Sequence, residues 1–138
     1  MLQSLHVLNF ALIEQVSLEF SSGLTVLTGE TGAGKSIIID ALSVVLGGRA
    51  STDVIRSGCD SFRVEAVFSL PPGHSVFQVM DSHGITQVEE TVILSRRVNK
   101  SGKNTIVING CQAPVTVLKK IGDLLVDMYG QHDNQALL

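Results

Sequence analysis

The sequence predicts a mixed α/β fold in which short strands surround one phosphate-binding loop and the helix that follows it. Residues 29–36 read Gly-Glu-Thr-Gly-Ala-Gly-Lys-Ser, a complete G-x-x-x-x-G-K-[ST] motif. An apolar segment at 24–28 precedes the motif and an apolar segment at 37–46 follows it, which is the strand–loop–helix order that phosphate binding needs. Several other segments alternate apolar and polar residues, as strands with one buried face do.

Two strands are expected before the motif, over residues 2–10 and 13–20. The second alternates apolar and polar side chains from Val16 to Phe20, so that one of its faces is buried and the other is wet. The run Ser-Ser-Gly at 21–23 then predicts a turn into the strand before the motif. These segments place an antiparallel layer beside the phosphate-loop strand.

The chain after the motif predicts further strands and two more helices. In order, we expect a helical turn over 53–57, a strand over 62–70, a short helix over 75–83, a hairpin of strands over 91–98 and 105–108, and a helix over 115–129. Only the strand before the motif is clearly of the parallel type. The fold expected is therefore a mixed sheet with an antiparallel, β-rich layer.

Composition narrows the class of protein. The chain has 138 residues, a net charge of −3 and 44% hydrophobic residues, so it forms one domain or part of one, with no global excess of basic residues. We expect no membrane span, since the apolar run at 37–46 is too short and contains Asp40, and no signal peptide, since the N-terminus lacks a basic stretch. Cys59 and Cys111 have no C-x-x-C spacing and are expected to be reduced thiols of a cytosolic protein.

The motif at 29–36 has a defined chemistry. Gly29, Gly32 and Gly34 remove the side chains that would keep backbone N–H groups away from a triphosphate. Lys35 supplies a point charge to the β- and γ-phosphates, and the Ser36 hydroxyl can complete the ligand shell of Mg²⁺. The residues expected to bind the phosphates of a nucleotide are Gly29, Glu30, Thr31, Gly32, Ala33, Gly34, Lys35 and Ser36.

Hydrolysis of a bound nucleotide needs one more element, an acidic residue at the end of a second buried strand. The nearest match is Leu-Leu-Val-Asp at 124–127, but it lies in a segment with helical periodicity. High apolarity combined with a single parallel strand also indicates an incomplete core that packs on a partner. We therefore expect the catalytic acid to lie outside this chain.

Four segments together resemble one family. They are Asn-Phe-Ala-Leu-Ile at 9–13, the strand and motif at 23–36, Leu-Gly-Gly-Arg-Ala at 46–50 and Gly-Gln-His at 130–132. This combination resembles the N-terminus of the RecN family of bacterial DNA repair proteins, which belongs with the SMC-like ATPases of the ABC class. The resemblance implies a P-loop NTPase of the ABC/SMC head type, of which residues 1–138 form the N-terminal lobe only.

The resemblance also implies partners and roles. The C-terminal lobe of the same head would carry the signature motif and the acidic strand, and a second head would close a dimer around two ATP molecules. Lys35 and Gln131 would be catalytic, with the Gln131 amide reaching Mg²⁺ and the attacking water. Arg49 would lie near the nucleotide or DNA, or would only be a cation favourable to a helix C-terminus. His132 would be a general base or a surface residue, and we expect the second. The implied role is repair of DNA double-strand breaks by a cytoplasmic, nucleoid-associated protein, with almost no hydrolysis by this chain alone.

A basic run lies on the predicted hairpin: Arg96, Arg97, Lys100 and Lys103. It forms either a patch that contacts DNA phosphates or a solvated hairpin. Two other functions stay open from the sequence. One is a free-standing P-loop phosphotransferase, and the other is a non-catalytic interaction module that binds nucleotide.

Overall fold

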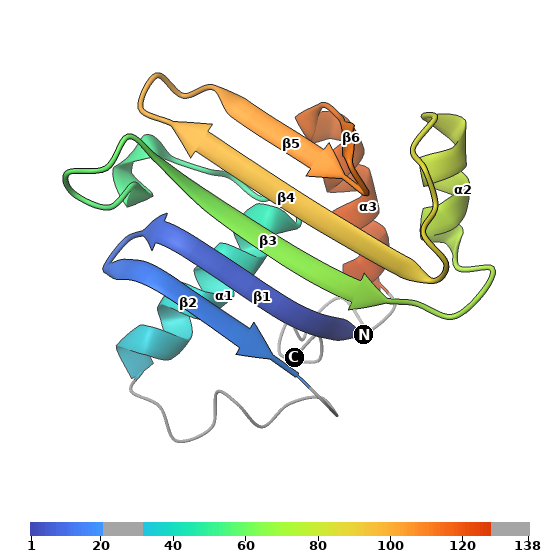
Figure 1. Ribbon diagram of the computed structural model, residues 1–138, viewed down its shortest axis with the longest axis horizontal. Helices are drawn as coiled ribbons and strands as arrows, with labels where there is room; N and C mark the ends of the chain where they lie inside the picture. The colour runs from blue at the N-terminus through green and yellow to red at the C-terminus, as the bar shows by residue number, and fades with distance from the viewer. Residues whose placement is uncertain (21–31, 128–138) are drawn as a thin grey trace.

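A computed structural model of the protein describes residues 1–20 and 32–127. In this part of the chain, six strands form one antiparallel sheet in the order β2-β1-β3-β4-β5-β6 (Figure 1). The strands are β1 (Leu2–Phe10), β2 (Ile13–Glu19), β3 (Ser61–Ser69), β4 (Thr91–Asn99), β5 (Asn104–Ile108) and β6 (Cys111–Gln112). The helices are α1 (Gly32–Val45), the 3₁₀ turn η2 (Thr52–Val54), α2 (Ser75–Ser82) and α3 (Val115–Asp127).

Among the described residues, helices cover one face of the sheet and leave the other face open. Along β3, Phe62, Val64, Ala66 and Phe68 are buried, while the residues between them point to the open face. Helices α1 and α3 lie behind the sheet in Figure 1, and α2 lies at one end of it. The hydrophobic core fills the space between the covered face and these helices.

The predicted strands over 2–10, 13–20, 62–70, 91–98 and 105–108 are confirmed within one or two residues. The three predicted helices are also present, although α1 starts at Gly32, five residues earlier than predicted. The last residues of the motif thus form the first turn of the helix, where backbone N–H groups have no acceptor inside the helix and can bind a ligand. The helical turn predicted over 53–57 is present only as the 3₁₀ turn Thr52–Val54, because the backbone is already extended at Ile55.

Two predictions about single segments have different outcomes. Residues 124–127 lie in α3 rather than in an acidic strand, as the helical periodicity indicated. The predicted strand at 24–28 lies outside the described residues. Cys59 and Cys111 are both free thiols, and in the described part of the chain no helix has the length and apolarity to cross a membrane.

Candidate functional site

Helix α1 carries the described part of the phosphate-loop motif. Its apolar side chains at Ile38, Ala41 and Leu42 are buried in the core that α1 shares with the sheet, whereas Ser36, Asp40 and Ser43 are exposed. The exposed residues are spaced by four and three, so they form one polar stripe along the helix. Ser36 stands at the start of this stripe, with its hydroxyl accessible to a ligand.

The first turn of α1 suits an anion. Its first four backbone N–H groups have no acceptor within the helix, and the helix dipole adds a partial positive charge there. The first turn contains no acidic residue that would compete for these donors. These features fit a bound phosphate, and they fit Mg²⁺ held by the Ser36 hydroxyl together with phosphate oxygens. No cluster of three or more His, Cys, Asp or Glu side chains that would form a separate metal site occurs in residues 1–20 and 32–127.

The C-terminal end of α1 closes with two glycines. Gly47 adopts φ +98°, a conformation that favours glycine. The Gly48 N–H donates to the Ser43 carbonyl at 2.9 Å, and the Gly47 N–H donates to the Val44 carbonyl at 3.1 Å. This pair of bonds is a Schellman motif, which ends the helix sharply.

Arg96 reaches this same end of α1 from β4. Its Nη1 donates to the carbonyl oxygens of Val44 at 2.8 Å and Gly48 at 2.7 Å, and its Nε donates to Asn104 Oδ1 at 2.8 Å. Arg96 as a whole residue is only 4% exposed. Burial lowers the pKa of Arg96, but a guanidinium stays protonated at neutral pH.

The prediction that Arg96 belongs to a DNA-facing basic run is therefore wrong. Neighbouring residues of a strand point to opposite faces of the sheet. Arg96 points to the covered face with Leu94 and Val98, while Arg97 points to the open face and is exposed. Arg97, Lys100 and Lys103 stay on the surface.

Arg97, Lys100 and Lys103 form a basic corner together with Arg63, which the sequence did not indicate as a site residue. Arg63 of β3 lies directly opposite Arg97 in the register of the sheet, and both are exposed. Like charges directly opposite each other repel. We define the basic corner by its members: Arg63, Arg97, Lys100 and Lys103. The alternation of residues 62–70 put Arg63 on the wet face, but nothing in the sequence gives the register that brings it to Arg97.

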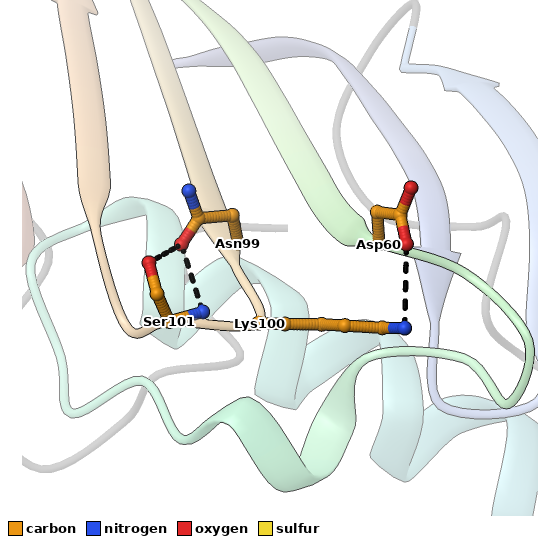
Figure 2. A network of polar contacts seen from close by, with 4 residues as sticks. All are labelled: Asp60, Asn99, Lys100 and Ser101. Carbon is orange, nitrogen blue, oxygen red and sulfur yellow. Dashed lines mark hydrogen bonds and ion pairs between the residues drawn. The ribbon is translucent and has the colours of Figure 1, made fainter.

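The turn between β4 and β5 holds part of the basic corner in place. Asn99 Oδ1 accepts hydrogen bonds from Ser101 N at 3.1 Å, Ser101 Oγ at 2.7 Å and Lys103 N at 3.0 Å. Lys100 Nζ lies 3.3 Å from Asp60 Oδ1, but both side chains are largely solvent-exposed, so the pair is weak (Figure 2). Lys100 is therefore available to an external anion.

Arg49 is exposed and lies next to the polar stripe of α1. It lines a hollow of about 240 Å³ together with Asp40 and Ser43. The structure thus brings Arg49 to the helix that carries the motif. Gly29, Glu30, Thr31, Gln131 and His132 lie outside the described residues, and the roles predicted for them stay predictions.

Comparison with known protein families gives a match over most of the chain. The sequence profile of the AAA domain family matches residues 4–131. The chain is 46% identical over its full length to the DNA repair protein RecN of Bacillus subtilis and 46% identical to that of Halalkalibacterium halodurans. It spans 24% of the length of each of these relatives.

Solved structures show the same fold in SMC head domains. A structure from work on ATP-driven dimerization and DNA stimulated activation of SMC ATPases has a TM-score of 0.68 and 27% identity, with 89% of this chain and 78% of that chain covered. An Smc head bound to the C-winged helix domain of ScpA has a TM-score of 0.67 and 27% identity, with 89% of this chain and 40% of that chain covered. The predicted SMC-like head fold is confirmed by these similarities.

Proposed function

We propose that this chain, which belongs to the AAA domain family, is the ATP-binding N-terminal lobe of a RecN-like DNA repair ATPase. One observation carries the proposal: a complete phosphate-loop motif runs directly into α1, whose first turn lacks an acidic residue. The full-length similarity to RecN proteins supports the DNA repair role. A DNA repair protein of this kind would act in the cytoplasm, at the nucleoid.

Different residues of the chain are proposed to bind different parts of Mg·ATP. The N–H groups of the loop and of the first turn of α1 bind phosphate oxygens, and Lys35 adds a point charge on the β- and γ-phosphates. Ser36 would hold Mg²⁺, which neutralises phosphate charge when it is bound. Gln131 is assigned to orient the attacking water, and Arg49 supplies a cation beside α1.

We propose that turnover requires an acidic strand that residues 1–20 and 32–127 do not contain. The described residues contain no acidic strand beside α1, and the relatives are about four times longer. We assign the acid to the C-terminal lobe of the same head. A second head would close an ATP-sandwiched dimer, and the similarity to SMC ATPases studied for ATP-driven dimerization supports this arrangement.

Binding of Mg·ATP tests the proposal most directly. Lys35→Ala removes a charge-assisted phosphate contact, so the affinity measured by calorimetry should fall by about 1.5–3 kcal/mol, roughly 10- to 150-fold in Kd. Lys120→Ala, which removes an exposed cation of α3, is the matched control and should bind like the wild type.

Other outcomes favour the competing functions. Equal affinity of wild type and Lys35→Ala would favour a non-catalytic module that keeps the loop as scaffold. Phosphoryl transfer to a small acceptor would favour a free-standing phosphotransferase. Fast hydrolysis by this chain without a C-terminal lobe would contradict the division of the machinery between two lobes.

The basic corner gives a second candidate contact, with DNA phosphates. Arg63→Gln and Arg97→Gln should each weaken binding of duplex DNA regardless of its sequence. Each should also lower the slope of log K against log salt by about 1. Lys120→Gln removes the same charge from α3 and should leave the slope unchanged. An unchanged slope in all three variants would mean that the basic corner is a solvated surface without a role in DNA binding.

A further inference from the structure

We infer that Arg96 is a positioning residue for the phosphate-loop helix. By fixing the C-terminal end of α1 to the sheet, Arg96 sets where the N-terminal turn of α1 meets the nucleotide. The inference rests on the proposed function, because it concerns the same ATP site. It assigns a role in that site to a residue about a helix length away from the phosphates.

The contacts of Arg96 are directional and lie at one point of α1. A single nitrogen, Nη1, donates to two carbonyl oxygens on either side of the helix end, those of Val44 and Gly48, at 2.8 and 2.7 Å. Asn104 Oδ1, at 2.8 Å from Nε, holds the other edge of the guanidinium. Apolar packing has no fixed direction, whereas the planar guanidinium, held by Asn104 of β5, makes two directional hydrogen bonds to the end of α1.

The chemistry of the acceptors explains why a cation is buried here. None of the three acceptors is a carboxylate, and an isolated buried charge is costly. Two of them are carbonyls at a helix C-terminus, where the helix dipole places partial negative charge that favours a cation. The guanidinium therefore binds to the end of α1 itself rather than to an acidic side chain.

Helix geometry carries this constraint to the nucleotide. The 14 residues of α1 extend about 20 Å, so a tilt of about 5° at the Arg96 end would move the first turn by about 2 Å. Misplacement of reacting groups by about 1 Å can cost about 100-fold in rate. Loss of the Arg96 contacts should therefore weaken the phosphate site without touching any residue in it.

Three variants separate positioning from stability. Arg96→Met removes all three hydrogen bonds, Arg96→Lys keeps the charge but offers a single donor group, and Val76→Ala removes buried apolar volume from α2, away from α1. Calorimetry with Mg·ATP, at a temperature where every variant is folded by circular dichroism, should show about a tenfold loss for Arg96→Met. Arg96→Lys should recover part of that loss, and Val76→Ala should bind normally.

A second measurement needs no nucleotide. The backbone amide signals of Gly34 and Lys35, in the first turn of α1, should shift in the NMR spectrum of Arg96→Met relative to wild type, and not in that of Val76→Ala. If Arg96→Met does not fold, Asn104→Ala, which removes only the Nε partner, should give the same shifts at smaller amplitude.

The results distinguish two failures. If wild type does not bind Mg·ATP, the proposed function fails, and the amide shifts still decide the role of Arg96. If wild type binds and both Arg96 variants bind equally well with unshifted Gly34 and Lys35 signals, Arg96 is only a structural residue of the core and the inference is overturned.

Discussion

Replacing Gly122 by alanine should destabilise the protein, although alanine is the better helix former. Intrinsic propensity alone favours Ala over Gly in a helix interior by about 1 kcal/mol. In α3, however, a Cβ at position 122 would lie 1.8 Å from the carbonyl oxygen of Leu46 and 2.7 Å from its carbonyl carbon. Packing and propensity therefore predict opposite signs for one substitution.

The size of the effect follows from the distance. A carbon and a carbonyl oxygen approach to about 3.3 Å at closest, so α3 would have to move away from the end of α1 by about 1.5 Å. That movement would loosen Leu118, Ile121 and Leu125, which are all fully buried. Overpacking against backbone, which cannot rotate away as a side chain can, should cost about 3 kcal/mol in the free energy of unfolding.

Urea unfolding followed by circular dichroism measures this change. Gly110→Ala is the matched control, because Gly110 has φ +81° but open space around its Cβ position. It should cost only the conformational strain, about 1–2 kcal/mol. If Gly122→Ala were as stable as wild type or more stable, α3 would not lie against α1 at the described distance, and the argument from packing would fail.

Two further predictions concern the surface. His74 caps α2 by accepting a hydrogen bond from the Val76 N–H at Nδ1, 3.1 Å away, and burial, followed by the N-terminal charge, lowers its pKa below 6.5. The folded state thus binds fewer protons at His74, so the contribution of His74 to the unfolding free energy should be constant well above pH 6.5 and should fall as the pH drops below 6.5 towards the lowered pKa. His74→Asn keeps a cap that does not titrate, and a pH series of urea titrations should show that this part of the slope is absent. Asn99→Ala removes the acceptor of three hydrogen bonds in the β4–β5 turn and should cost about 1–2 kcal/mol, whereas Lys100→Ala, which removes only an exposed ion pair, should cost less than about 0.5 kcal/mol. Equal losses of unfolding free energy in Asn99→Ala and Lys100→Ala would contradict the role of Asn99 as the residue that stabilises this turn.

The existence of most elements follows from local patterns. Residues 62–70 alternate because β3 has one face on the core and one face in solvent, and the sequence shows this period directly. The first residue of α1 is not predictable in this way. The motif predicts a loop as far as Ser36, whereas residues 32–36 already belong to the helix. The motif specifies the residues that bind phosphate, and it does not specify the residue at which the helix begins.

The order and register of the strands could not be predicted in the same way. β1 pairs with β3, more than 40 residues further along the chain, and this pairing depends on packing in the whole sheet rather than on local periodicity. The basic corner likewise depends on strand register. Arg63 joins Arg97 only through the register between β3 and β4.

For Arg96, the predicted strand and the predicted basic run contradict each other, and the strand prediction is the correct one. The same periodicity that predicts a strand over 91–98 places position 96 on the face of Val92, Leu94 and Val98, so a surface patch containing both Arg96 and Arg97 conflicts with the strand itself. A charged side chain on the buried face of a strand needs hydrogen-bond acceptors within the core. The nearby acceptors are the carbonyls at the end of α1. Consecutive arginines on one strand therefore serve opposite faces: Arg97 is available to an external anion, and Arg96 holds the helix that is proposed to bind ATP.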